Sequence, residues 1–570
     1  MIVKMRYFGF RTTNTLFFCA LSLWFFYLIF DTFEYLKFSE VSWFGIDNTT
    51  SYIAQLFFIN DNWAFPLLRN PGYGDVLSTS LTFTGPSPIL ALPMKIFGIS
   101  PEIQFFGFWI LLNIFLQLIF GYRFLRLLGG SVIFSRLFTI FFITPFFIIK
   151  TQGHFWLTSH YLILWSLCIL FGYLLKRVYK TWEVSLLLCL SYLTNIYLLA
   201  MVLSVVSLTV ILRLFSSPRN LRAISSDIAT ALFTLLFTFF LFDGINRQET
   251  IYESVKMYLS STYGYHGFNL LTFINPDTGI VAEGLANIPN NLPIFSVLPI
   301  SLGMIPGAYE GFMYLGLGTL LASVLAFFTR RHTKSKSGIV LEKNQRRVII
   351  LATFLLTLFA VSYRVGFGSW SIVLPFPTYL DWLLGTFRSS GRFMWPVAYA
   401  LIGIVLIRLH RFVTSRVNRK AKLILLFTII AIQVIDVSVP LIRQKKEIFL
   451  TVNNNDFRSN KFLEASEVLK PYKSIRAYPQ GDFLENHYAE LNYLAWTLNI
   501  RTDLHFTSRI NMNALYKREE ETLNDLCSGN LRPSVAYAVT NARAVDLASC
   551  YKKLEPIFED EFHTFYGIIP

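Results

Sequence analysis

The first apolar stretch, residues 12–30, reads TTNTLFFCALSLWFFYLIF and carries no charged side chain. Its length is enough to cross the hydrocarbon core of a bilayer as an α-helix, because a span needs roughly 17–25 residues. Lys4, Arg6 and Arg11 precede the stretch, and no small-residue cleavage site follows it. We therefore expect a retained membrane anchor rather than a removed signal peptide.

The rest of the chain repeats this pattern. Of its 570 residues, 54% are hydrophobic and 15% are charged, whereas soluble proteins carry about 25% charged residues. This composition excludes a disordered, fibrous or secreted soluble protein. We predict an α-helical polytopic membrane protein with about eleven transmembrane helices. After the first helix we place the others at residues 104–125, 132–149, 161–176, 183–196, 197–214, 226–242, 312–329, 347–363, 393–409 and 422–440.

Basic residues separate the two sides of the membrane. Every second loop is rich in Lys and Arg, as expected for loops that stay in the cytoplasm. These basic loops lie near residues 123–126, 176–180, 213–222, 330–347 and 408–422. The pattern predicts a cytoplasmic N-terminus and an extracytoplasmic C-terminus. It also explains the net charge of +15 without a nucleic-acid partner.

Most of the polar sequence then lies outside the cytoplasm. We predict a transmembrane domain over residues 1–440 with three large outer loops, and a small α/β domain over residues 441–570. The loops cover residues 31–103, 243–311 and 364–392. There is no GxGxxG motif and no P-loop, so nucleotide chemistry has no visible site.

Two cysteines, Cys527 and Cys550, lie in the C-terminal domain. Disulfides persist in oxidising extracytoplasmic compartments, and closing a loop of this length contributes roughly 3 kcal/mol on a chain-entropy model. We predict a disulfide between them. Two free, buried thiols are the alternative, because spacing alone cannot place the two Cα atoms within about 7 Å.

Asp47 follows the first helix at the membrane boundary. A carboxylate in this position can act as a general base toward an acceptor hydroxyl if it is partly buried and within hydrogen-bond reach. The alternatives are a solvated loop residue or the N-cap of a helix over residues 49–58.

His154 and His160 lie between the third and fourth predicted helices. Six residues apart on a helix, they point about 120° from each other and form a poor zinc pair compared with an i, i+4 pair. They are candidates to bind a sugar hydroxyl or a phosphate. Structural histidines bonded to the backbone are the alternative.

Arg388 and Arg392 lie on the outer side, against the usual charge bias. At i and i+4 they would share one face of a helix, and Arg is well shaped to bind phosphate. We predict a phosphate site there, which Arg364 can join. The alternatives are an ion pair with Asp381 or Glu310, or snorkelling.

Glu310 precedes a glycine-rich stretch that suits close helix packing. It is a candidate sugar contact or a partner for a helix dipole. Tyr263 and His266 belong to a polar, aromatic loop that is a weaker candidate for stacking on a sugar.

Three of these segments resemble motifs of one bacterial family, the membrane proteins with a domain of unknown function of type 6311, which is grouped with GT-C glycosyltransferases. Residues 153–164 resemble a GHxxLxxHWLIL segment, residues 310–318 an EGxxYLGLG segment, and residues 387–396 an FRxxGRFFWP segment. The resemblance covers about residues 15–565.

The resemblance implies a GT-C-like fold in the bacterial inner membrane, with an active site and a C-terminal domain that face the periplasm. Such enzymes transfer a sugar from a polyprenyl-phosphate donor to a glycan or lipid acceptor. Asp47 occupies the place of the usual base. The resemblance leaves open whether the reaction uses a divalent cation such as Mg²⁺ or Mn²⁺ as a cofactor.

Two positions depart from the expected pattern. Gly85 stands where we expect an Asp, and Lys150 stands where we expect an Arg. Another acid such as Asp75 would have to replace the missing carboxylate, or the activity would differ.

Two other functions compete with transfer. A lipid-linked saccharide transporter or flippase would need polar residues at mid-membrane and internal repeats, and Asp436 is the main residue in its favour. A non-catalytic envelope-glycan assembly protein is the third candidate, and Gly85 favours it.

Overall fold

The fold is described from a computed structural model of the whole chain. The structure describes residues 12–216, 221–243, 263–278, 295–298, 300–328, 341–452, 457–458, 463–485, 487–507, 512–543, 554–560 and 563–568.

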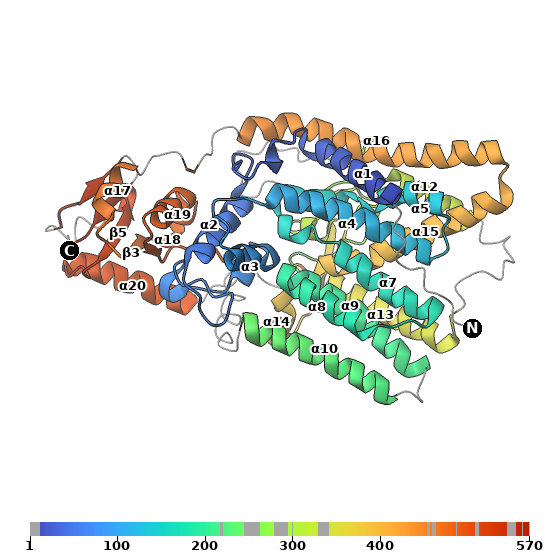
Figure 1. Cartoon of the computed structure of the whole chain (residues 1–570), viewed down its shortest axis with the longest axis horizontal. Coiled ribbons are helices and arrows are strands. Elements are labelled where there is room, and N and C mark those ends of the chain that lie inside the picture. Colours follow the sequence, from blue (N-terminus) through green and yellow to red (C-terminus); the bar gives the residue numbers. More distant parts are fainter. Residues whose placement is uncertain are drawn as a thin grey trace.

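Each apolar stretch predicted from the sequence is largely helical, and the long helices lie side by side (Figure 1). Together they form the body of a multi-pass membrane protein. Their bounds are α1 Thr12–Phe30, α4 Phe106–Leu127, α5 Val132–Phe138, α6 Pro145–Gly153, α7 Tyr161–Lys176, α8 Thr181–Thr194, α9 Ile196–Ser216, α10 Leu221–Phe242, α12 Leu317–Phe328, α13 Lys343–Val361, α15 Trp395–Arg416 and α16 Arg419–Val452.

Not every apolar helix in the described residues is long enough to cross a membrane. Within the described residues, seven helices are long and apolar enough to cross a membrane, or eight if the pair α5 and α6, bent by 57°, counts as one span. Helices α1, α8 and α12 are shorter apolar helices. The predicted count of eleven crossings therefore stays a prediction.

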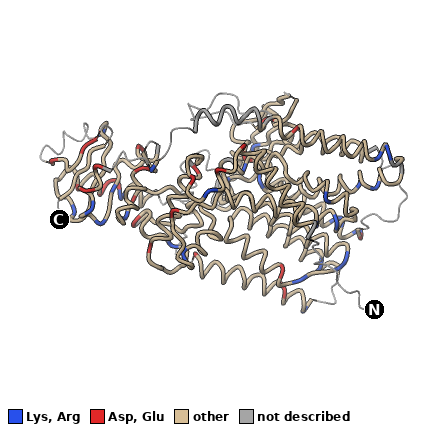
Figure 2. The backbone as a smooth tube through the Cα atoms, turned by 45° about the horizontal axis from the view of Figure 1, so that its top comes forward, with Lys and Arg blue, Asp and Glu red and all other residues tan. Residues whose placement is uncertain are grey.

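Charge is distributed unevenly along the bundle. Figure 2 shows Lys and Arg concentrated at the end of the helices that is remote from the C-terminal region. This is the asymmetry expected of the basic loops in the sequence. The orientation of the termini across the membrane stays a prediction.

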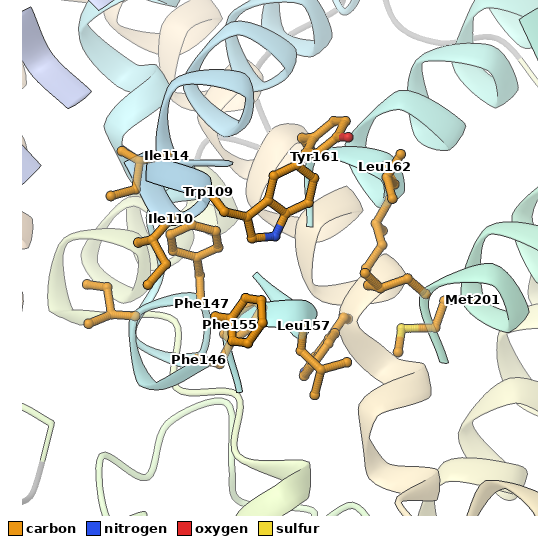
Figure 3. Packing of buried hydrophobic residues seen from close by; sticks show 14 of the residues in the cluster. Trp109, Ile110, Ile114, Phe146, Phe147, Phe155, Leu157, Tyr161, Leu162 and Met201 are labelled. Carbon is orange, nitrogen blue, oxygen red and sulfur yellow. The ribbon is translucent and has the colours of Figure 1, made fainter. Parts of the chain in front are cut away.

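The interior of the bundle is packed largely with aromatic and aliphatic side chains, several of which are shown in Figure 3. Helices that are apolar on most faces can bury this much surface against one another. Among the residues in contact are Trp109, Ile110 and Ile114 of α4, Phe146 and Phe147 of α6, Tyr161 and Leu162 of α7, and Met201 of α9.

The glycine-rich stretch brings α12 close to α16, as the sequence predicted. A Cβ atom at Gly318 would lie 2.6 Å from Cβ of Gln433. Gln433 also accepts a hydrogen bond from the backbone N–H of Thr319 at 3.0 Å. Only a residue without a side chain fits this contact.

The C-terminal region contains a five-stranded mixed sheet in the order β4-β3-β5-β7-β6. Strand β3 (Ser474–Tyr478) pairs in parallel with β4 (Arg501–Thr502) and β5 (Val535–Thr540). Strand β7 (His563–Tyr566) pairs antiparallel with β5 and with β6 (Phe558–Glu559). The helices of this region are α17 Leu463–Leu469, α18 Gln480–Glu485, α19 Tyr488–Thr497 and α20 Met512–Ser528.

Part of the first outer loop covers the open edge of this sheet. The backbone N–H of Thr502 donates to the Gly72 carbonyl at 3.1 Å, and that of Gly74 donates to the Thr502 carbonyl at 2.8 Å. The same loop carries α2 (Ile46–Asn60) and α3 (Pro88–Phe97). The C-terminal region therefore contacts the segment that contains Asp47.

The third outer loop holds a hairpin of β1 (Arg364–Phe367) and β2 (Trp370–Val373), followed by the short helix α14 (Asp381–Leu384). Three 3₁₀ turns complete the region near the helix ends: η5 Phe155–Leu157, η8 Ala308–Gly311 and η12 Ser390–Met394.

Candidate functional site

A buried cluster of charged side chains lies where α6, η8 and η12 meet. Its centre is Glu310, whose Oε2 atom lies 2.6 Å from Lys150 Nζ and 2.6 Å from Arg392 Nη2. Arg392 Nε donates to the same oxygen at 3.0 Å. All three side chains are less than a tenth exposed. One carboxylate therefore faces two cations in a region of low dielectric.

Asp47 and His154 connect this cluster to solvent. Nδ1 of His154 lies 3.1 Å from an oxygen of Asp47, and its Nε2 lies 3.6 Å from Oε1 of Glu310. The Asp47 side chain is 37% exposed and that of His154 is 28% exposed. The imidazole is thus placed between an exposed acid and a buried one.

The position of Asp47 follows from its helix. Helix α2 begins at Ile46, with Gly45 as its N-cap, so it starts earlier than the predicted residue 49. Asp47 lies in the first turn and is not the N-cap. Its carboxylate benefits from the partial positive charge of the helix N-terminus.

Three glycines allow the segments of the cluster to meet, and each is adjacent to a candidate residue. A Cβ atom at Gly391 would lie 2.7 Å from the Cα of Gly311 and 3.0 Å from the backbone of Gly267. The backbone N–H of Gly391 donates to the His266 carbonyl at 3.1 Å. Contact between bare backbones brings Glu310 and Arg392 together.

The charges of the cluster shift the pKa values of Glu310 and His154. Burial tends to raise the pKa of Glu310, but Arg392 and Lys150 outweigh burial and hold that pKa well below its usual range. Burial tends to lower the pKa of His154, but contacts with Asp47 and Glu310 outweigh it, so that pKa is raised. Glu310 is therefore ionised at neutral pH, and protonation of His154 is favoured.

The two outer arginines do not lie on one helix, so this part of the prediction is wrong. Ser389, at φ −85° and ψ 59°, separates the turn Gly385–Phe387 from η12. The close contact of Gly391 with Gly311 and Gly267 sets the path of the backbone here. Arg392 makes the ion pair with Glu310 that the sequence left open as an alternative.

Arg388 is half-buried, and its positive charge acts to lower the pKa of both His266 and Tyr309. Burial nevertheless raises the pKa of Tyr309 to about 12. Arg364 lies at the start of the same loop, in β1, where its Nη1 donates to the Pro306 carbonyl at 3.2 Å. The phosphate-binding role of these arginines stays a prediction.

The other candidates contact the protein itself. Nδ1 of His160 lies 2.8 Å from the hydroxyl of Tyr399 inside the bundle. His266 is buried, its Nδ1 lies 2.7 Å from the Gly307 carbonyl, and burial lowers its pKa. The hydroxyl of Tyr263 donates to the Phe359 carbonyl at 2.8 Å. Their role in substrate binding stays a prediction.

The structure gives a physical reason for Gly85. Its φ of +101° is unfavourable for any residue with a side chain, and a Cβ atom there would collide with Oγ of Ser51 on α2. An Asp at this position would need a different backbone. Asp75, the other acid considered for this role, pairs with Arg518 of α20 at 2.5 Å.

The described residues were searched for ligands of the divalent cation that the sequence left open. They contain no group of three or more His, Cys, Asp or Glu side chains that could hold a metal ion. Mg²⁺ can also bind through one or two carboxylates together with a substrate phosphate, and no chemical step is assigned to a cation.

Two participants were missed as site residues in the sequence. Lys150 was noted only as a departure from the family pattern, and Tyr197 was not singled out. The ring of Tyr197 lies 4.8 Å from the Arg392 guanidinium, and its hydroxyl accepts from the Ser389 N–H at 3.3 Å. A lysine inside an apolar stretch was the available signal, because a buried charge needs a partner. No comparable signal marked Tyr197.

Asp436, the residue that most favoured transport, is fully buried. Its carboxylate accepts hydrogen bonds from Ser296 Oγ at 2.5 Å, Tyr314 Oη at 3.0 Å and the Leu317 N–H at 2.8 Å. It thereby caps α12 and ties the preceding loop to α16.

Cys527 of α20 is disulfide-bonded, whereas Cys19, Cys168 and Cys189 are free. Cys550 lies outside the described residues. The predicted pair Cys527–Cys550 therefore stays a prediction.

Comparisons with known proteins complete this description. Two solved structures of ArnT from Cupriavidus metallidurans are similar. The apo structure has a TM-score of 0.49 and 11% identity, and the structure bound to undecaprenyl phosphate has a TM-score of 0.46 and 10% identity. Both comparisons cover 97% of this chain and 98% of the other. No curated protein matches the chain. Residues 19–438 match the family described as Domain of unknown function (DUF6311), and the chain belongs to this family.

Proposed function

We propose that this protein is a membrane glycosyltransferase that moves a sugar from a polyprenyl-phosphate donor to a periplasmic or lipid-linked glycan acceptor, with inversion at the anomeric carbon. One observation carries the proposal. The half-exposed carboxylate of Asp47 is linked through His154 and Glu310 to two buried cations. Three of these residues, His154, Glu310 and Arg392, belong to the segments that resemble the family motifs.

Asp47 is the proposed general base. Its carboxylate takes the proton of the acceptor hydroxyl while the hydroxyl oxygen attacks the anomeric carbon of the donor. The bond from that carbon to the phosphate oxygen breaks, and the lipid phosphate leaves with the electron pair. His154 positions the carboxylate, because its Nδ1 lies 3.1 Å from Asp47.

The cluster has the charge to favour an anionic donor. Lys150 and Arg392 balance Glu310 and Asp47, so a protonated His154 leaves one net positive charge, and Arg388 adds another. Because Arg392 already neutralises Glu310, we assign direct phosphate contact to Arg388 and Arg364. Arg392 contributes through its electrostatic field. Fixed cations near a leaving phosphate stabilise the charge that develops on it.

Transport lacks comparable support. The hydrogen bonds of Asp436 to a helix N-terminus and to two hydroxyls give it a structural role. We therefore propose transfer alone.

Mass spectrometry of lipids that co-purify with the protein tests the proposed base. Asp47→Asn should retain a sugar-loaded polyprenyl phosphate, whereas the wild type should carry polyprenyl phosphate without the sugar. Asp482→Asn is the matched control, because the Asp482 side chain has a similar exposure of 40% but lies in the C-terminal region. It should behave as the wild type does. Identical lipids in Asp47→Asn and the wild type would refute the role of Asp47.

Native mass spectrometry with added polyprenyl phosphate tests the phosphate site. Arg388→Ala should weaken binding. Arg177→Ala should not, because Arg177 follows the far end of α7 and pairs with Glu342. Equal affinity in the two variants would count against Arg388 as a phosphate contact.

A further inference from the structure

The β1–β2 hairpin exposes a row of large apolar side chains. Phe367 is 57% exposed, Trp370 80%, Ile372 67% and Val373 64%. A strand with this surface in water would promote aggregation. The hairpin therefore needs an apolar surface to contact.

Neighbouring loops hold the hairpin in place and extend its apolar surface. The side chain of Asn269 donates to the Gly368 carbonyl at 2.7 Å, and the N–H of Leu270 donates to the Gly366 carbonyl at 2.9 Å. The carbonyl of Leu302 approaches Gly368 closely. Four further exposed apolar residues lie in these loops: Leu270, Leu298, Ile300 and Leu302.

The hairpin follows a candidate membrane helix that has an exposed apolar face. Strand β1 begins three residues after α13, which is one of the candidate spans. Helix α13 exposes Ile350, Leu351, Phe354, Leu355 and Leu358. Between Arg347 and Asp381, Arg364 is the only charged residue in the sequence. The apolar surface therefore passes from the helix into the hairpin with a single charged residue at their junction.

We propose that the β1–β2 hairpin inserts into the lipid leaflet on the side of the C-terminal sheet. In this arrangement acyl chains cover the exposed face of α13, and the hairpin extends that face. Trp is enriched at the membrane–water boundary because its ring is apolar and its N–H is polar. Arg364, at the base of the hairpin, suits the level of the lipid phosphates.

This insertion has a consequence for the charged cluster. The chain passes from β2 through α14 to Arg388 and Arg392. An inserted hairpin fixes the depth of this segment relative to the lipid headgroups. The test below measures depth alone and does not depend on any catalytic activity.

Fluorescence quenching measures the depth directly. Cys19, Cys168 and Cys189, which are free, are replaced by Ala, and one new cysteine is labelled in the full chain in vesicles of phosphatidylethanolamine and phosphatidylglycerol. Ile372→Cys tests the hairpin. Lys470→Cys is the control, because the Lys470 side chain is 57% exposed in the C-terminal region. Lipids with a nitroxide near the headgroup should quench the label at position 372 at least about twofold more than the label at 470.

Aqueous iodide should show the opposite order. Equal quenching of the two labels by iodide would overturn the proposal, as would cross-linking of two copies through position 372. A second set of variants tests whether the apolar side chains of the hairpin set its depth. With the label at Ser371→Cys, the changes Trp370→Ser and Ile372→Ser should lower quenching by lipid nitroxides. Unchanged quenching would show that these side chains do not set the depth.

Discussion

Replacement of Glu310 by Gln should strongly destabilise the protein. The Glu310 side chain is 7% exposed, and its Oε2 atom contacts Lys150 and Arg392, which are 6% and 8% exposed. The variant keeps the shape of the side chain but leaves two buried cations without their shared anion. Removing one partner of a buried ion pair costs about 3–5 kcal/mol. We expect a loss of this size in the free energy of unfolding, measured by denaturant titration in mixed micelles.

A second substitution separates charge from packing. Lys150→Met removes one of the two cations, so the double variant Glu310→Gln/Lys150→Met buries one unpaired charge instead of two. It should be less destabilised than the sum of the two single variants. The coupling should exceed about 0.5 kcal/mol, the usual limit for independent sites.

The control is Glu467→Gln. The Glu467 side chain is 76% exposed and pairs with Lys470 on the surface, where an ion pair is worth about 0–1 kcal/mol. Two results would refute the reasoning: a loss in Glu310→Gln no larger than in this control, or additive effects in the double variant.

Four other predictions concern His154, Gly85, Asp75 and the cysteines. The raised pKa of His154 means that its contact with Asp47 and Glu310 is fully present below the ordinary histidine pKa and is lost as pH rises through the raised value. The thermal midpoint should therefore fall with rising pH in the wild type more than in His154→Gln, and parallel curves would contradict this. Gly85→Ala should cost more than about 1 kcal/mol of stability because of its positive φ, and Ser51→Ala should recover part of the loss by removing the atom that Cβ would meet; a neutral Gly85→Ala variant would disprove it. Asp75→Asn breaks the pair with Arg518, which joins the first outer loop to the C-terminal region. It should therefore speed limited proteolysis of both segments where they meet, whereas Asp482→Asn should not. Alkylation of the denatured, unreduced protein should modify three thiols, and reduction should raise this to all five cysteines; five reactive thiols before reduction would exclude the disulfide.

The membrane helices could be predicted from the sequence because they depend on the hydrophobicity of one continuous stretch of residues. A run such as Phe106–Leu127 partitions into a bilayer by its own composition, and the basic residues between runs mark the loops. Asp47, His154, Glu310 and Arg392 were singled out in the same local way, as polar residues at the ends of apolar runs. The close packing at Gly316 and Gly318 could also be expected, because glycines allow the backbones of neighbouring segments to approach each other.

Only the tertiary structure decided which of these residues meet. Lys150 and Glu310 are 160 positions apart, and Arg392 follows Glu310 by 82. No local pattern encodes such a contact, because it depends on the backbones of Gly267, Gly311 and Gly391 touching at the ends of different helices. For the same reason the sequence could not show that Arg392 uses its charge on Glu310, or that the backbone at Gly85 leaves no room for an acid. A charged side chain pairs with whatever the fold places beside it, and burial makes that pairing obligatory.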